Sequence, residues 1–303
     1  MREAHAGFCR GNEMHRPGIA GWRARRALAF GAVLALASAL TAAAPAQADL
    51  LEEIKQRGTF VVGTEARFPP FEFVEGGEIV GYSSDMMEHI MEALPGVTLE
   101  QLDLPWQGIL PGLAAKRFDY VITSVTVTKE RYDAYHLSLP IADATMAVIK
   151  RKGDDSIGSA EDIAGKVVGS QAGSAQLQAL EALAAELEAA GTPVSEIRTY
   201  VDFGEAYADL AAGRLAAVVN SLPNQLEAAR QRPDVFEVVL PTFGPKKYFS
   251  WAGRKDEESA SLNAFMDEQI RALHESGVLA DLQRKWFGDV MELPSDRLPE
   301  PAE

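Results

Sequence analysis

The stretch WQGILPGLAAKRFDYVITSVTVTKERYDAYHLSLP, residues 106–140, combines a helix pattern, a short apolar run and a group of hydroxyl side chains that ends in one arginine. Apolar residues recur at helical spacing in its first half, and the run 120–122 is typical of a covered parallel strand. In an open α/β sheet, ligands bind beyond the carboxyl ends of the strands. We therefore expect the hydroxyls to lie in a loop that forms half of an anion-binding pocket, with Arg131 as its anchor.

The amino-terminal residues 1–48 are predicted to be a cleavable export signal. Arginines cluster at 23–26, the apolar run 27–40 follows, and the segment ends in Ala-Gln-Ala, a small-residue pattern that signal peptidase accepts. The apolar run is short and rich in alanine, whereas a membrane span needs about 20 strongly apolar residues. We expect a soluble periplasmic protein, with Met1 and Met14 as alternative starts.

Composition restricts the class of protein further. The 303 residues are enough for about two domains. The single cysteine, Cys9, lies in the leader, so the exported chain has no disulfide, no thiolate nucleophile and no cysteine for a lipid anchor. Six of the 29 basic and two of the 44 acidic residues also lie there, which leaves a formal net charge of −19. Such a surface repels phosphate backbones, and we expect no nucleic-acid partner.

Strand and helix patterns alternate through two series. The first is predicted as strand 59–63, helix 85–94, strand 97–102, helix 106–116 and strand 119–123. The second is predicted as strand 146–149, helix 160–163, strand 166–170, helix 174–190, strand 196–200, helix 204–212, strand 216–219, helix 224–230 and strand 235–240. This alternation indicates an α/β protein with a mainly parallel sheet in each of two domains. Helices 259–274 and 279–287 follow, and the proline-rich segment 293–303 is expected to be a frayed tail.

Several short motifs stand in a characteristic order. They are GT at 63–64, FPPFEF at 68–73, GY at 81–82, WQGILPGL at 106–113, RFDY at 117–120, TKER at 128–131, SLP at 138–140, VGSQAGS at 168–174, LAAGR at 210–214 and KWFG at 285–288. Each motif alone is weak, but in this order the chain resembles the extracellular solute-binding proteins, family 3, which serve ABC importers for polar amino acids. The resemblance covers about residues 50–288.

The resemblance implies a type II periplasmic binding protein fold with two α/β lobes and two crossing hinge strands, near 142–147 and 248–252. The implied divisions are a discontinuous first lobe of 49–144 with 248–290, a second lobe of 145–247, and a tail of 291–303. Such proteins close like a hinge on one small molecule held between the lobes.

The resemblance also implies roles for residues of the first lobe. Arg131 matches the arginine that grips a ligand carboxylate, and its planar fork suits bidentate pairing. Ser124 and Thr126 match positions that hold the same carboxylate and the ligand amine. Phe68 and Trp106 match two positions that sandwich the ligand between aromatic faces, where a cation–π contact contributes roughly 0.5–2 kcal/mol.

In the second lobe, Ser174 and Gln176 open a long predicted helix. A helix start offers free N–H groups that bind an anion, and Ser174 also suits an N-cap. The chain departs from the family at Ser221, where members for α-amino acids usually carry an aspartate that pairs with the ligand ammonium. Three interpretations stay open: Glu65 takes over, neutral groups such as Asn220 and Ser221 suffice, or the ligand lacks a free α-amino group.

An enzyme on the same fold is the main alternative class. Cyclohexadienyl dehydratases, which act on prephenate or arogenate, resemble these binding proteins and carry a catalytic glutamate in the segment that here reads SLPNQ, 221–225. That general acid is lacking. The histidines after the leader are isolated, and no phosphate-binding glycine loop is present.

The sequence therefore predicts a receptor and not an enzyme. We expect it to capture a small carboxylate-bearing, amino-acid-like ligand in the periplasm and to deliver it to an ABC permease in the inner membrane. An opine, a betaine or an organic acid is the alternative ligand. We expect a monomer that uses no cofactor and no metal.

Overall fold

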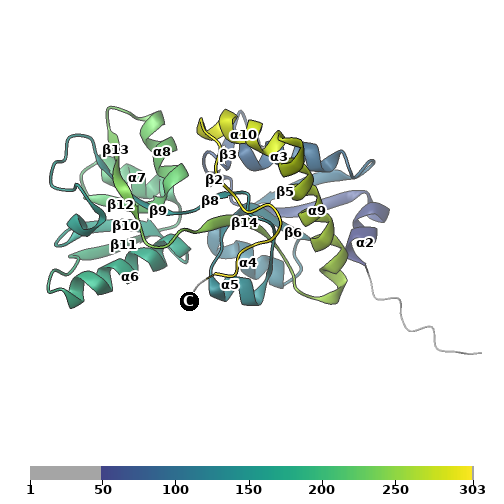
Figure 1. Ribbon diagram of the computed structural model, residues 1–303, viewed down its shortest axis with the longest axis horizontal. Coiled ribbons are helices and arrows are strands. Elements are labelled where there is room, and N and C mark those ends of the chain that lie inside the picture. The colour runs from purple at the N-terminus through teal and green to yellow at the C-terminus, as the bar shows by residue number, and fades with distance from the viewer. Residues whose placement is uncertain (1–48, 302–303) are drawn as a thin grey trace, which may run out of the picture. The chain divides into compact units, whose positions relative to one another are not determined.

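The computed structural model describes residues 49–301, so the predicted signal peptide and Cys9 lie outside the described residues. The described residues belong to one compact unit, drawn in Figure 1. Within 49–301, no helix is long and apolar enough to cross a membrane.

The first sheet has the strand order β5-β1-β6-β14-β7, with β8 also paired to β14. Its strands are β1 (Thr59–Thr64), β5 (Thr98–Asp103), β6 (Tyr120–Thr126), β7 (His136–Leu137), β8 (Ala142–Asp143) and β14 (Tyr248–Gly253). Strands β5, β1 and β6 run parallel, whereas β14 runs antiparallel to its neighbours. Strand β14 thus joins this sheet from a distant part of the chain, as a discontinuous first lobe requires.

The second sheet has the order β11-β10-β12-β9-β13. Its strands are β9 (Met146–Arg151), β10 (Val167–Gln171), β11 (Glu196–Tyr200), β12 (Ala217–Ser221) and β13 (Phe236–Phe243). Again three strands are parallel, and β9 is antiparallel to both β12 and β13. A small antiparallel sheet beside the first one contains β2 (Arg67–Phe68), β3 (Glu72–Glu75) and β4 (Glu78–Val80). The predicted α/β class is confirmed, although both large sheets are mixed.

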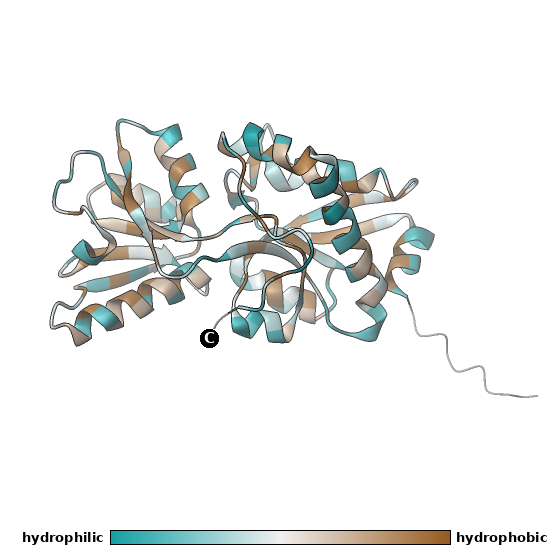
Figure 2. Ribbon diagram, in the orientation of Figure 1, coloured by the Kyte–Doolittle hydropathy of each residue, from teal (hydrophilic) through white to brown (hydrophobic). Residues whose placement is uncertain are grey.

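Helices flank the sheets and bury their apolar sides in three clusters of core residues. They are α2 (Leu50–Arg57), α3 (Tyr82–Met91), α4 (Trp106–Ala114), α5 (Lys129–Ala134), α6 (Ala175–Ala189), α7 (Phe203–Ala211), α8 (Leu222–Gln231), α9 (Ala260–Ser276) and α10 (Val278–Phe287), with short 3₁₀ turns η1 (Ala160–Ile163) and η2 (Glu257–Ser259). Figure 2 shows the helices banded with hydrophobic and hydrophilic residues, as expected where one side faces a core.

The chain passes between the large sheets twice. It leaves β8 and enters β9 at residues 143–146, and it leaves β13 and enters β14 at 244–247. The second passage precedes the predicted position at 248–252, because those residues pair with β6 inside the first sheet. The exact limits of the two lobes stay a prediction.

Two local predictions are wrong. The hydroxyl side chains of Ser124 and Thr126 lie in β6 and not in a loop, because the strand continues to Thr126 in register with β14. The segment after α10 is not frayed in its described part. Leu293 and Leu298 pack against core clusters, and Lys246 Nζ donates to Glu292 O at 3.5 Å.

Helix α4 carries Trp106 toward the second lobe, and two of its glycines offer a matched test of its packing. A Cβ on Gly112 would lie 2.7 Å from the ring of the buried Phe118, whereas a Cβ on Gly108 would meet no atom within 4 Å. We expect Gly112→Ala to lower the free energy of unfolding by about 1–3 kcal/mol through overpacking. Gly108→Ala should be neutral or raise it by up to ~1 kcal/mol, because alanine favours a helix. Urea unfolding of both variants checks this, and equal effects would contradict it.

Candidate functional site

Eight of the ten predicted site residues line one small cavity between the lobes. They are Glu65, Phe68, Trp106, Ser124, Thr126, Arg131, Ser174 and Gln176, and the ninth lining residue, Gln171, was not predicted. The cavity measures about 10 Å³, close to the size that holds one water molecule. In this conformation the lobes therefore contact each other across the site almost without a gap.

Arg131 is held in the first lobe by α5, which begins after its N-cap Thr128. Its side chain is only 7% exposed. Nη1 donates to Thr126 O at 3.0 Å, Nη2 donates to Gly173 O of the second lobe at 3.5 Å, and the guanidinium lies 4.8 Å from the centre of the Trp106 ring. Burial lowers the pKa of Arg131 to about 10. Among the ion pairs of the described residues, none involves Arg131.

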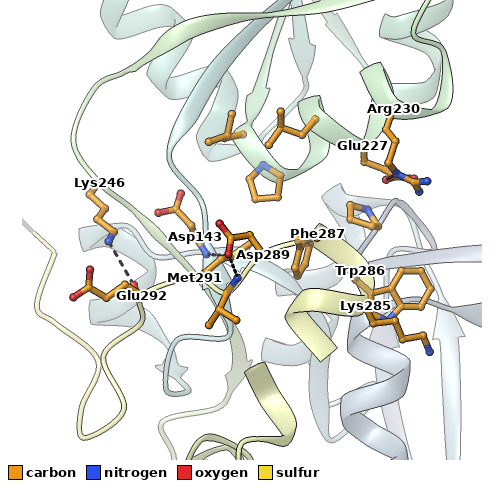
Figure 3. A pocket seen from close by; sticks show the side chains of 16 residues that line it. Asp143, Glu227, Arg230, Lys246, Lys285, Trp286, Phe287, Asp289, Met291 and Glu292 are labelled. Atoms are coloured by element: carbon orange, nitrogen blue, oxygen red, sulfur yellow. Dashed lines mark hydrogen bonds and ion pairs between the residues drawn. The ribbon is translucent and has the colours of Figure 1, made fainter. Parts of the chain in front are cut away.

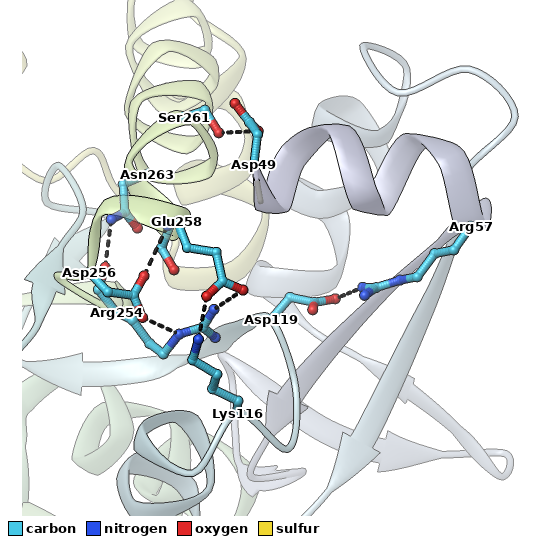
Figure 4. Close-up of polar contacts among 10 residues, drawn as sticks. Asp49, Arg57, Lys116, Asp119, Arg254, Asp256, Glu258, Ser261 and Asn263 are labelled. Carbon is cyan, nitrogen blue, oxygen red and sulfur yellow. Dashed lines mark hydrogen bonds and ion pairs between the residues drawn. The ribbon is translucent and has the colours of Figure 1, made fainter. Parts of the chain in front are cut away.

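Arg254 is a second buried arginine, and its partners differ from those of Arg131. It is also 7% exposed, but its guanidinium meets Asp256 at 2.9 Å and Glu258 at 3.7 Å (Figure 4). Asp256 in turn caps η2. A buried charge is costly unless it is paired, so Arg254 has the surroundings of a structural arginine and Arg131 does not. The partners of the Arg131 guanidinium are carbonyl oxygens and an aromatic face. Hydrogen bonds to a carboxylate would be stronger than these contacts.

The second lobe contributes the start of α6. Ser174 is its N-cap, and its hydroxyl accepts from Leu177 N–H at 3.0 Å and donates to Gln171 O at 2.8 Å. Trp106 Nε1 of the first lobe donates to Gly173 O at 2.9 Å. The hydroxyl of Ser174 is thus occupied by capping, and the helix start offers its backbone N–H groups.

Phe68 forms one wall of the cavity and packs mainly against other rings. Its ring centroid lies 6.0 Å from that of Phe71, 5.7 Å from that of Phe203 and 5.8 Å from that of Phe249. Among the ring pairs of residues 49–301, it does not stack with Trp106. Both rings line the cavity, and the predicted sandwich of a ligand between them stays a prediction.

Glu65 lies directly after β1 and is 3% exposed. Its Oε1 accepts a hydrogen bond from Gln171 Nε2 of the second lobe. Burial raises the pKa of Glu65 to about 8, against a lowering by Gln171, and the nearby carboxylates of Glu72 and Asp202 raise it further. Arg67 lowers it, and the guanidinium of Arg67 itself makes two hydrogen bonds to Asp103 at 3.0 and 2.9 Å.

The structure does not bring Asn220 and Ser221 into this cavity. Asn220 lines a neighbouring cavity of about 150 Å³ on the other side of Phe68, and its Nδ2 donates to Tyr207 Oη at 3.1 Å. The hydroxyl of Ser221 donates to Asn224, whose Nδ2 donates to Pro69 O at 2.7 Å. Both polar groups are thus engaged within the second lobe or in its contact with the loop at Pro69.

Sequence reasoning missed Glu72, which lies in β3 behind the cavity and is fully buried. Its carboxylate accepts from Thr123 Oγ1 at 2.6 Å, Ser83 Oγ at 2.8 Å, Ser124 N at 2.9 Å and Ser124 Oγ at 3.4 Å. Burial raises its pKa to about 7, and the hydrogen bonds lower it. The sequence feature that could have indicated Glu72 is its position as the single acidic residue in the otherwise apolar segment FPPFEF.

A larger cavity of about 560 Å³ lies elsewhere, between α8 and the segment that follows α10 (Figure 3). Its cations already have partners: Arg230 pairs with Glu227 at 2.8 Å, Lys285 pairs with Asp85 at 2.6 Å, and Lys246 donates to a backbone carbonyl. Size alone therefore does not make it the functional site. Within residues 49–301, no group of three or more His, Cys, Asp or Glu side chains could hold a metal ion.

The model of the bacterial extracellular solute-binding proteins, family 3, matches residues 60–289. The chain belongs to this family. It is 29% identical over 266 residues to the L-cystine-binding protein TcyJ of Escherichia coli (strain K12), covering 87% of this chain and 96% of that protein.

Solved structures of binding proteins share the fold. An ancestral arginine-binding protein bound to arginine is 34% identical, with a TM-score of 0.68 and coverage of 77% of this chain and 99% of that one. The P235GK mutant of ArgBP from T. maritima is 30% identical, with a TM-score of 0.70 and coverage of 79% and 100%. The fold prediction is confirmed, and these relatives support a binding protein over an enzyme.

The buried carboxyl of Glu65 predicts a pH dependence of stability. Its pKa in the folded state is about 8 against an ordinary value of 4.5, so the folded state keeps a proton that the unfolded chain loses. This contribution to stability is complete below about pH 4.5 and is lost as the pH rises toward 8. The melting temperature of Glu65→Gln, relative to the unchanged protein, should therefore rise from pH 5 to about pH 8.5.

Glu188→Gln is the control, because Glu188 lies exposed on α6. Its melting temperature relative to the unchanged protein should stay constant over the same pH range. A constant difference for Glu65→Gln as well would show that Glu65 ionises at its ordinary pKa.

Proposed function

We propose that this protein is the periplasmic receptor of an ABC importer and captures an amino acid between its two lobes. Family membership supports the general role. The observation that carries the ligand class is Arg131, a buried guanidinium in the cleft without a carboxylate partner among the described residues. A ligand carboxylate would supply the charge-assisted, bidentate partner that the protein itself does not.

An acidic side chain, whose raised pKa an adjacent ammonium would lower, and a basic side chain line the same cavity without pairing with each other. Arg131 bonds to carbonyl oxygens, and Glu65 accepts from Gln171. A zwitterion matches this arrangement, with its carboxylate at Arg131 and its ammonium at Glu65. Of the three interpretations left by the sequence, we therefore favour Glu65 as the group that replaces the aspartate expected at Ser221.

Ligand entry requires the lobes to separate, because the cavity of about 10 Å³ is far too small for an amino acid. We propose that residues 49–144 with 248–290 move as one body against 145–247. The short passages at 143–146 and 244–247 would take up the rotation. On closure around a ligand, the start of α6 would add its N–H groups to the carboxylate cage.

Export by a cleavable signal, a monomeric state and delivery to an inner-membrane permease complete the proposal. The relatives named above are described as binding cystine or arginine, so these amino acids are the first candidates as ligands. A smaller, neutral amino acid such as glutamine completes a reasonable test panel. The dehydratase alternative has little support, since the start of α8 supplies no acid before Glu227, which is paired with Arg230.

Replacement of Arg131 tests the carboxylate anchor. We expect L-arginine, L-cystine or L-glutamine to raise the melting temperature of the unchanged protein. Arg131→Met should weaken the same ligand by more than about thirtyfold, equivalent to ~2 kcal/mol. Without ligand, this variant should be at least as stable as the unchanged protein, because an apolar side chain replaces a buried cation that has no carboxylate. Thermal shift and calorimetric titration measure both effects.

Arg254→Met is the matched control, since Arg254 is equally buried but paired with Asp256 and Glu258. It should melt at a lower temperature and still respond to ligand. If Arg131→Met binds the ligand as tightly as the unchanged protein, the anchor is wrong.

Replacement of Glu65 tests the ammonium partner. Glu65→Gln should weaken an α-amino acid by about tenfold and leave its des-amino analogue nearly unaffected, because the analogue has no ammonium to lose a partner. Titration with matched pairs, such as L-arginine and des-amino arginine, gives the comparison. Equal losses for both members of a pair would show that Glu65 does not face the amine.

A further inference from the structure

We propose that Glu72 is a positioning residue that fixes the Ser124 hydroxyl as a hydrogen-bond acceptor and thereby directs the ligand's ammonium to Ser124. This inference rests on the proposed function and adds to it a specificity device behind the cavity. It also narrows the role of Ser124, which the family resemblance places among the groups that hold the ligand carboxylate and the ligand amine.

The surroundings of Glu72 are those of a charge solvated by the protein. The side chain is fully buried, and four donors from two elements reach its two oxygens: Thr123 Oγ1, Ser124 N, Ser124 Oγ and Ser83 Oγ. No lysine or arginine pairs with it among the ion pairs of the described residues. A carboxylate with this many hydrogen bonds retains its charge more readily than burial alone allows, since such bonds favour the ionised form.

The hydrogen bonds of Glu72 determine what Ser124 can offer to a ligand. A hydroxyl has one proton and two lone pairs, and an ionised carboxylate only accepts. The backbone N–H of Ser124 and its hydroxyl proton both point to Glu72, at 2.9 and 3.4 Å. Ser124 also lines the cavity with Arg131 and Glu65. Only lone pairs of Ser124 therefore remain for a ligand.

Lone pairs accept from an ammonium and repel a carboxylate. The ammonium end of the site thus contains Glu65 as a direct partner and Ser124 as an oriented acceptor. The carboxylate end contains Arg131 and the N–H groups at the start of α6. A buried acid and a buried guanidinium that line the cavity, with a second buried acid behind Ser124, favour a zwitterion over a plain organic acid.

Replacement of Glu72 by glutamine reverses the direction of one hydrogen bond. The amide NH₂ can only donate, so a hydroxyl that gave its proton to the carboxylate must now accept, and the Ser124 proton becomes available to the cavity. Binding is measured by calorimetric titration at about pH 8.5, because Glu72 is ionised in the unchanged protein at that pH. The probes are L-arginine, L-glutamine and L-cystine, each with its des-amino analogue.

We expect Glu72→Gln to lower the preference for the amino acid over its des-amino analogue by about tenfold. Ser124→Ala should lower this ratio by a similar factor, and Glu72→Gln should have no further effect on the ratio in a Ser124→Ala background. Ser83→Ala removes another donor to Glu72 outside the cavity, and Glu227→Gln removes a buried carboxylate of the second lobe. Both should leave the ratio unchanged.

Two results would overturn the inference. In the first, Glu72→Gln weakens the amino acid and its des-amino analogue equally. In the second, Glu72→Gln still lowers the preference for the amino acid in a Ser124→Ala background. If Glu72→Gln does not fold, a ratio that Ser124→Ala leaves unchanged would still overturn the inference, because the Ser124 hydroxyl is the group that Glu72 is inferred to orient. Binding of no probe to the unchanged protein would overturn the proposed function and this inference with it. Binding of the probes with a ratio unaffected by Glu72→Gln and Ser124→Ala would overturn the inference alone.

Discussion

The burial of the Arg131 guanidinium between the two lobes is the constraint on which the rest of the site depends. A cation taken out of water needs partners, and here they are Thr126 O of its own lobe, Gly173 O of the other and the face of Trp106. The contrast with Arg254, which has two carboxylates, shows that the fold can supply acids to a buried arginine. At Arg131 it supplies neutral oxygens, which a ligand carboxylate can replace with a gain in electrostatic energy.

An acid and a guanidinium that line one cavity without pairing are the basis of the proposed zwitterionic ligand. Glu65 follows β1 and lines the cavity, Glu72 lies behind it in β3, and Arg131 lies in α5, so different elements hold the two acids and the guanidinium. Each acid is satisfied by amides or hydroxyls and not by the nearby cation. These hydrogen bonds favour the ionised form of each acid, whereas burial raises the pKa of both.

Sequence reasoning predicted most of the elements and most of the residues that line the small cavity, because both depend on local patterns. The order of strands places Arg131, Trp106 and Ser174 at strand or helix ends, and family motifs fix those positions. It failed where side-chain contacts decide the outcome. Ser221 looked free to meet a ligand, but its hydroxyl donates to Asn224, one turn along α8. The role of Glu72 depends on donors from Ser83 and β6, which no spacing reveals.

The same atoms that would bind a ligand now join the lobes to each other. Trp106 and Arg131 donate to Gly173 O, Gln107 donates to Ala172 O, and Gln171 donates to Glu65. A ligand must exchange these contacts for its own, so its affinity is the difference between the two sets and not the sum of its contacts. Under the proposed function, a ligand with a single charge would replace the contacts at Arg131 or at Glu65, whereas a zwitterion would replace both. The contact between the lobes would then contribute to selectivity.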